Sequence, residues 1–236
     1  MSLSSASRGR TAWPAGRRPS PDGANGRIAP VPRRKSLFVV LEGPDKSGKS
    51  TQARLLVEAL AALGRPVLHT REPGGAGVAE AIRKVLLDPK LKVSPVAELF
   101  LYEASRAQHT EEILRPALEA GKVVVCERYT LSTDVYQGLA RGLGLKTTGT
   151  LNRIATGELA PGLTIVIDVP DSEFHRRDRK RALDRLEREN AAFKRRVRAG
   201  YRRLARSAPK TMLLDGTRDA DDLHREILRR VERRLA

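Results

Sequence analysis

Aromatic side chains are scarce in this sequence of 236 residues: Phe, Trp and Tyr make up 4%, although 40% of the residues are hydrophobic. The chain is long enough to bury a full core, and one folded domain with a mainly aliphatic core is the economical expectation. The shortage of rings also argues against a protein that stacks nucleic-acid bases on aromatic side chains, even though the net charge is +17.

Cysteine and long apolar runs are lacking as well. The single cysteine, Cys126, cannot form an internal disulfide, and its place in the apolar run Val123–Cys126 predicts buried packing. No apolar run approaches the ~18 residues of a membrane span. The N-terminal stretch has no apolar centre of the kind found in a secretory signal. Together these absences predict a cytoplasmic protein with no membrane partner.

The positive charge is concentrated in two stretches. Residues 1–35 carry eight basic residues against one acidic residue, and residues 171–206 carry fourteen against six. The first stretch is rich in Pro, Gly, Ser and Arg without apolar periodicity, which predicts a disordered tail. We expect this tail to have no function; a tether to nucleic acid or to an anionic surface is the less favoured alternative. Phosphate handling explains the second stretch better than nucleic-acid binding does.

From residue 36 onward, short apolar runs alternate with helical patterns, which is typical of a parallel sheet with crossover helices. The expected helices are 52–63, 78–87, 96–120, 187–205 and 219–235, and Gly64 is a fitting residue to end the first. The expected strands are 37–41, 66–70, 122–126, 163–169 and 211–214. The pattern predicts one α/β domain over residues 36–236.

A phosphate-binding loop follows the first expected strand. Residues 43–51, GPDKSGKST, satisfy the pattern GxxxxGK[ST] between a strand and a helix. The glycines let backbone N–H groups point inward, and the helix N-terminus adds a positive dipole end. Lys49 is expected to reach the β- and γ-phosphates of ATP, and the Ser50 hydroxyl to ligate Mg²⁺. The predicted ATP site comprises Gly43, Pro44, Asp45, Lys46, Ser47, Gly48, Lys49, Ser50 and Thr51.

This loop predicts a three-layer sandwich of the P-loop NTPase type with a five-stranded parallel sheet. The loop alone does not distinguish among kinases, GTPases and ATPases. The chain has no NKxD motif of a GTPase and no DxxG motif outside the P-loop, and a motor ATPase is usually longer. A small chain with a basic segment late in the sequence favours a nucleotide kinase, whose lid excludes water from the transferring phosphoryl group. We expect this lid at about residues 171–188.

Further motifs resemble the thymidylate kinase family over nearly all of residues 37–236. They are TREPGG at 70–75, a helix at 98–109, the ERY triplet at 127–129, and DRLE at 184–187 within the lid. The resemblance implies a dTMP kinase that uses ATP and Mg²⁺ in dTTP biosynthesis, and it implies a homodimer. It also implies that Asp45 helps to hold the acceptor nucleotide and that Arg71 meets the acceptor phosphate.

The resemblance extends to the base and the sugar of the acceptor. Tyr102 and Arg106 share a helix face, and in the family this pair stacks on thymine and binds its edge, with Phe usual at the position of Tyr102. Arg128 would hold the acceptor phosphate near the γ-phosphate, and Tyr136 would lie by the sugar edge. Glu127 replaces the usual Asp near Mg²⁺. The implied substrate site comprises Asp45, Arg71, Tyr102, Arg106, Arg128, Ser132, Thr133, Tyr136 and Gln137.

Catalysis of phosphoryl transfer needs charge neutralisation rather than covalent participation by the protein. We expect Lys49 and Arg128 to provide it together with lid arginines, and Lys46 to assist from the P-loop. Arg181 and Arg185 are the expected lid residues, chosen from the arginine-rich set Arg176, Arg177, Arg179, Arg181 and Arg185.

Two alternatives stay open from the sequence. Tyr102 and Glu127 leave room for another deoxynucleotide or nucleoside kinase with a different acceptor. The protein could also be a catalytically weak nucleotide-binding module that associates with nucleic acid through its basic tail and lid.

Overall fold

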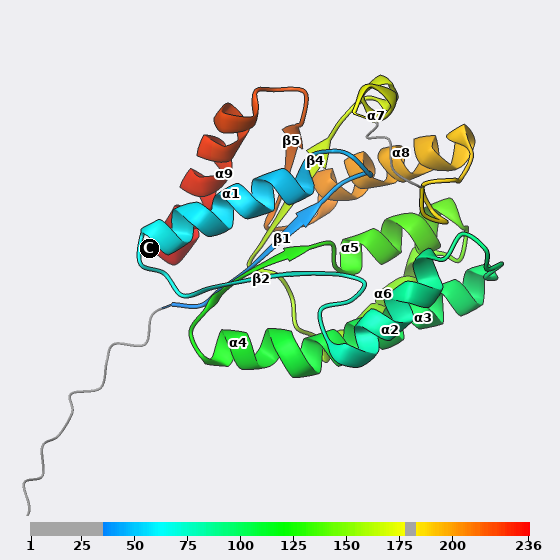
Figure 1. Ribbon diagram of the computed structural model, residues 1–236, viewed down its shortest axis with the longest axis horizontal. Helices are drawn as coiled ribbons and strands as arrows, with labels where there is room; N and C mark the ends of the chain where they lie inside the picture. The colour runs from blue at the N-terminus through cyan, green and yellow to red at the C-terminus, as the bar shows by residue number, and fades with distance from the viewer. Residues whose placement is uncertain (1–34, 178–182) are drawn as a thin grey trace, which may run out of the picture. The chain divides into compact units, whose positions relative to one another are not determined.

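The computed structural model describes residues 35–177 and 183–236 (Figure 1). The expected tail, apart from residue 35, and the lid residues Arg179 and Arg181 lie outside the described residues.

The five expected strands form one parallel sheet with the order β2-β3-β1-β4-β5. All six residues of the central strand β1 are buried, which agrees with an apolar strand covered on both faces. The strands are β1 Leu37–Glu42, β2 Val67–Arg71, β3 Val123–Glu127, β4 Leu163–Asp168 and β5 Thr211–Asp215.

Helices cover both faces of this sheet. On one face α1 and α9 pack against β1, β3 and β4 through an aliphatic core that includes Leu41, Leu56 and Ile227. On the other face α8 packs against β4 and β5, and α4 packs against β3 (Figure 1). The helices are α1 Lys49–Ala62, α2 Gly77–Leu87, α3 Pro95–His109, η1 Thr110–Leu114, α4 Arg115–Glu119, α5 Thr130–Thr133, η2 Asp134–Ala140, α6 Leu145–Thr156, α7 Asp171–Arg176, α8 Ala191–Ser207 and α9 Ala220–Leu235.

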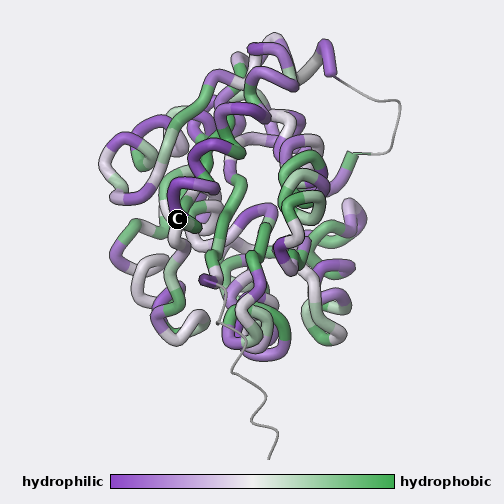
Figure 2. Tube along the Cα trace, turned by 90° about the vertical axis from the view of Figure 1, so that its left-hand side faces the viewer, coloured by the Kyte–Doolittle hydropathy of each residue, from purple (hydrophilic) through white to green (hydrophobic). Residues whose placement is uncertain are grey.

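The result is the predicted three-layer α/β sandwich. Figure 2 shows the hydrophobic strands inside, surrounded by helices whose colour alternates between hydrophilic and hydrophobic. Gly64 follows α1 with φ 69°, as expected for the residue after a helix. Cys126 is fully buried and unpaired with another cysteine, which confirms its packing role. In the described part of the chain, no helix combines the length and the apolarity that crossing a membrane requires.

The helices differ from the prediction in several places, one of which is α7, a helix in the stretch that was expected only as part of the lid. The expected helix 96–120 is divided into α3, the π-helical turn η1 and α4. Residues 130–156 were not predicted to be helical, yet they contain α5, η2 and α6. The buried positions of α6 are Thr148, Asn152 and Thr156, so this helix has no apolar stripe that a sequence pattern could detect.

Candidate active site

The P-loop crosses the carboxyl end of β1 in a conformation that depends on glycine. Gly43 has φ 136°, and a Cβ atom at this position would lie 2.3 Å from the carbonyl oxygen of Ile167. Gly48 has φ 104° and directly precedes α1. Both positions therefore exclude side chains, and α1 begins with its positive N-terminal end at the loop.

Lys49 folds back over this loop. Its Nζ donates to the carbonyl oxygens of Gly43 at 3.1 Å and of Pro44 at 2.8 Å. Burial, followed by repulsion from the nearby Arg128 guanidinium, lowers the pKa of Lys49 to about 7. A phosphate placed in this loop would favour the charged ammonium again, because opposite charge raises the pKa of a lysine.

The side chains of Ser50, in the P-loop motif, and Glu127, at the end of β3, are in contact. The Ser50 hydroxyl donates to Glu127 Oε2, and Glu127 Oε1 lies 3.0 Å from His69 Nε2. Burial alone would raise the pKa of Glu127, but hydrogen bonds from His69 and Ser50 hold it below its usual value. A hydroxyl and an ionised carboxylate are ligands suited to Mg²⁺, so these residues fit the ion. His69 was not expected from the sequence.

A cavity of about 300 Å³ connects the P-loop to α3. It brings together most of the predicted site, drawn from β2, α3, η2 and the segment after β3. The lining includes Asp45, Lys46, Lys49, Ser50, Arg71, Tyr102, Arg106, Glu127, Arg128, Ser132, Thr133, Tyr136 and Gln137. The size is that of a small-molecule site rather than a macromolecular one.

Arg128 lines the cavity next to the P-loop, where its Nη1 donates to the carbonyl oxygen of Gly43 at 3.2 Å. Its backbone has φ 70°, and its guanidinium contacts the Asp45 carboxylate and donates to Tyr201 Oη at 3.0 Å. Its guanidinium carbon also lies 5.3 Å from the centre of the Tyr136 ring, and Tyr136 Oη donates to Asp45 Oδ2 at 3.3 Å. Asp45, Arg128 and Tyr136 thus form one polar cluster at the cavity wall.

Glu42 supports this cluster from the end of β1 and is fully buried. Its Oε1 accepts the backbone N–H groups of Tyr129 at 2.8 Å and of Ser132 at 3.1 Å, and its Oε2 accepts the Ser132 hydroxyl at 2.6 Å. Burial raises the pKa of Glu42 despite the attraction of Arg128. The carboxylate anchors the backbone on which Arg128 stands, a role that the sequence did not reveal.

Arg106 reaches the cavity but is mainly a framework residue. Its side chain is buried, with Nε 2.9 Å from Glu72 Oε2 and Nη1 3.0 Å from Glu103 Oε1. It also donates to Thr133, to Asn152 and to the carbonyl oxygen of Tyr129. Together, these bonds and the two ion pairs use four of the five N–H groups of the guanidinium, counted among the described residues. One N–H group is left for the base edge that the family resemblance implies.

Two further arginines, Arg71 and Arg83, line the cavity. Arg71 lines the cavity at the end of β2, where Nη2 donates to Glu80 Oε1 at 3.0 Å. Arg83 of α2 also lines it and donates to the carbonyl oxygen of Pro73 at 2.7 Å. Burial and repulsion from Arg71 lower the pKa of Arg83. Arg83 escaped the sequence prediction because nothing in α2 marks which of its basic residues faces the cavity.

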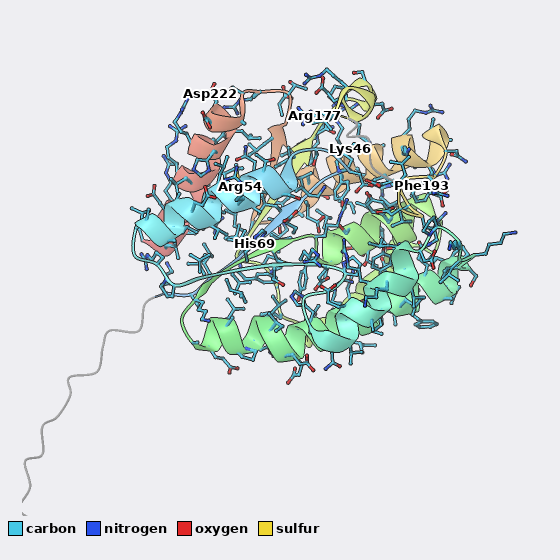
Figure 3. All side chains as sticks on the ribbon, viewed as in Figure 1. Lys46, Arg54, His69, Arg177, Phe193 and Asp222 are labelled. Atoms are coloured by element: carbon cyan, nitrogen blue, oxygen red, sulfur yellow. The ribbon has the colours of Figure 1, made fainter. Side chains whose placement is uncertain are left out.

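The lid arginines do not occupy equivalent places. Arg185 does not line the cavity; its Nη1 donates to Glu98 Oε2 at 2.5 Å and its Nε to the carbonyl oxygen of Leu86 at 2.8 Å. These contacts favour an anchoring role over the expected catalytic one. Arg176 is exposed and pairs with Glu173, whereas Arg177 approaches the P-loop at Lys46 (Figure 3). Arg181 lies outside the described residues.

Comparison with known proteins decides the family. A family model described as thymidylate kinase matches residues 41–227. The chain belongs to the thymidylate kinase family. Similar relatives include the thymidylate kinase of Deinococcus radiodurans, 45% identical over 202 residues that cover 85% of this chain and 98% of the relative. That of Thermoanaerobacter pseudethanolicus is 43% identical over 202 residues, covering 85% of this chain and 100% of the relative.

A solved thymidylate kinase has the same fold. The crystal structure from Ehrlichia chaffeensis aligns with a TM-score of 0.68 and 31% sequence identity, over 84% of this chain and 98% of that one. The chain is accordingly a nucleoside-monophosphate kinase that phosphorylates dTMP to dTDP in nucleotide biosynthesis. The relatives give no support to a different acceptor or to a nucleic-acid-binding module.

Proposed function

We propose that ATP, held with Mg²⁺ at the P-loop, is the phosphoryl donor, and that the cavity holds dTMP with its phosphate toward Arg128. The observation that carries this proposal is that one cavity is lined both by Lys49 of the P-loop and by Tyr102 and Gln137 on the α3 side. A donor phosphate and an acceptor base can therefore occupy the two ends of the same space, as direct transfer between them requires.

On the donor side, Lys49 and the first turn of α1 would bind the β- and γ-phosphates, as in other P-loop proteins. Ser50 and Glu127 would hold Mg²⁺, which neutralises charge on the transferring phosphoryl group when bound. The oxygen ligands of these two residues, already in contact, support this assignment.

On the acceptor side, Tyr102 would stack on the thymine ring while Asp45 and Tyr136 approach the sugar. Arg71, Arg128 and the unpredicted Arg83 would supply positive charge around the acceptor phosphate. Ser132 and Thr133 complete the wall on the side of α5. Charge spreading over the transferring group would then meet Lys49 and Arg128 without covalent participation by the protein.

Steady-state coupling of ATP to dTMP, dUMP, dCMP and AMP tests this arrangement. We expect dTMP to have the highest kcat/KM, followed by dUMP, and activity to require a divalent cation. Preference for dCMP or AMP would contradict the proposed acceptor site. Full activity with Lys49→Ala, in place of a loss of about a hundredfold or more, would contradict the donor site.

We further propose a homodimer in the cytoplasm. The adjacent helices α2, α3 and α6 carry exposed apolar residues, among them Val96 at 51%, Phe100 at 57% and Ile154 at 72% exposure (Figure 1). Such a face favours burial against a second copy. Light scattering after size exclusion should give twice the chain mass, and Phe100→Asp should halve it. A monomeric wild-type protein would contradict the dimer.

A further inference from the structure

Gln137 is the cavity residue whose orientation is fixed by a buried charge. It lies in η2, is 1% exposed and lines the cavity beside Tyr102. Its Nε2 donates to Oε1 of Glu98 at 2.8 Å, and Glu98, in the first turn of α3, is fully buried. No donor in the described ranges is bound to Gln137 Oε1.

The chemistry of Glu98 settles which end of the Gln137 amide faces it. An ionised carboxylate accepts hydrogen bonds and donates none, so the Gln137 group next to it must be the NH₂. Glu98 stays ionised because Arg141 binds both of its oxygens, at 3.2 and 3.1 Å, and Arg185 binds Oε2. Burial would raise the pKa of Glu98, but the hydrogen bonds from Arg141 and Gln137 hold it below the usual value.

This orientation has a consequence for base selection. With its NH₂ committed to Glu98, Gln137 presents a carbonyl oxygen to the cavity, which can accept a hydrogen bond but cannot donate one. Thymine and uracil carry an N–H group at N3, whereas cytosine carries an unprotonated acceptor nitrogen there. A fixed acceptor therefore pairs with the first two bases and faces cytosine with an unmatched lone pair.

We propose that Glu98 is a specificity-determining positioning residue: by fixing the Gln137 amide it makes the site select a pyrimidine with an N3–H group over cytosine. Glu98 does not touch the substrate and acts only through Gln137. The proposal rests on the placement of the acceptor base beside Gln137 that is proposed above. It also gives Arg185 a function, because this lid arginine helps to keep Glu98 charged and in place.

The variant Glu98→Gln tests the proposal because its outcome is directional. Glu98 Oε2 accepts N–H groups from both Arg141 and Arg185, whereas Oε1 accepts a single, longer one from Arg141 Nε at 3.2 Å. A glutamine at 98 would therefore keep its oxygen on the Oε2 side and turn its NH₂ toward Gln137. Gln137 would then flip and present its own NH₂ to the cavity. We expect the ratio of kcat/KM for dTMP to kcat/KM for dCMP to fall at least about tenfold, with kcat/KM for dCMP rising.

The exchanged double variant Glu98→Gln with Gln137→Glu provides the rescue. Residue 98 would donate its NH₂ to a carboxylate at 137, whose other oxygen again offers only an acceptor to the cavity. We expect this variant to regain most of the dTMP preference. The matched control is Glu189→Gln: Glu189 binds the same arginine, Arg141, at 2.6 Å but does not contact Gln137, so its ratio should match the wild type.

Each outcome bears on the proposal. Circular dichroism melting of every variant identifies any that fails to fold, and the exchanged variant then provides the comparison. A folded Glu98→Gln variant with an unchanged ratio would overturn the proposal, as would an equal fall in Glu189→Gln. A wild-type enzyme that accepts dCMP as well as dTMP would instead contradict the proposed placement of the base, independently of Glu98.

Discussion

Glu72 and Arg106 form an ion pair that is almost completely buried, with 2.9 Å between Arg106 Nε and Glu72 Oε2 and only 2% and 3% of the two side chains exposed. Glu72 Oε1 also lies 3.0 Å from Nδ1 of the buried His109. This carboxylate therefore fixes the TREPGG segment to α3. It links the element that carries Arg71 to the one that carries Tyr102.

Glu72→Gln should destabilise the protein strongly. Removing one partner of a buried pair leaves the other charge poorly compensated, and we expect the free energy of unfolding to fall by about 3 kcal/mol in urea denaturation. Glu80→Gln is the matched control, because its pair with Arg71 is exposed to 39% and 50% and should contribute less than about 1 kcal/mol. An equal decrease in the free energy of unfolding of Glu72→Gln and Glu80→Gln would contradict the expected difference between the buried and the exposed ion pair.

Arg177→Ala and its neighbour Arg176→Ala form a second pair of test and control variants. Arg177 Nη1 lies 3.3 Å from the carbonyl oxygen of Ser47 and Nη2 lies 2.7 Å from that of Gly216, so it ties the P-loop to the β5–α9 connection. Arg176 pairs with the same Glu173 but is exposed. We expect Arg177→Ala to raise KM for ATP about tenfold through loss of these hydrogen bonds, and Arg176→Ala to leave it unchanged. Similar KM values for both variants would contradict a role of Arg177 in holding the P-loop.

Lys49 should make the capture of ATP depend on pH. Because burial lowers the pKa of Lys49 to about 7, the ammonium predominates below pH 7 and the neutral amine above it. We expect kcat/KM for ATP to fall as pH rises through 7, approaching about tenfold per pH unit if only the ammonium binds ATP. Bound phosphates raise the pKa, so kcat at saturating ATP should stay constant to higher pH.

The control for this prediction is Lys49→Arg, whose guanidinium remains charged throughout the range. Its kcat/KM for ATP should be lower but should not show the fall near pH 7. A wild-type profile that is flat from pH 6 to 9, or one that is shared by Lys49→Arg, would show that another group controls the pH dependence.

The five strands and the P-loop could be predicted because their signals are local. β1 and β3 are apolar runs buried on both faces, and the loop between β1 and α1 has a fixed spacing of glycines, Lys49 and Ser50. The family resemblance placed Tyr102, Arg128 and Gln137, and all three line one cavity.

The supporting residues could not be predicted, since their meaning depends on partners distant in sequence. Glu98 binds Gln137, 39 positions away, and Glu42 binds Ser132, 90 positions away. Each is a single carboxylate in an otherwise apolar or helical stretch. For the same reason the sequence could not separate Arg185, which is turned toward Glu98, from the arginines that line the cavity.

Tyr102 stands where the family resemblance leads us to expect Phe, and its hydroxyl should matter little. Burial raises the pKa of Tyr102 far above the physiological range, so the phenol is neutral and the ring remains available for stacking. We expect Tyr102→Phe to keep KM for dTMP within about threefold, because stacking on the ring is retained. Tyr102→Ala should raise it about tenfold to a hundredfold, as loss of one base stack does elsewhere.

Steady-state titration of dTMP at saturating ATP measures both values, and KM for ATP serves as the internal control because Tyr102 lines the cavity from α3 and is not part of the P-loop. A large effect of Tyr102→Phe would mean that the hydroxyl itself recognises the acceptor. An unchanged KM for dTMP in Tyr102→Ala would show that the base does not stack on this ring and binds elsewhere in the cavity. A stacking contact that does not depend on the phenol hydroxyl predicts a rise in KM only for dTMP and only in Tyr102→Ala.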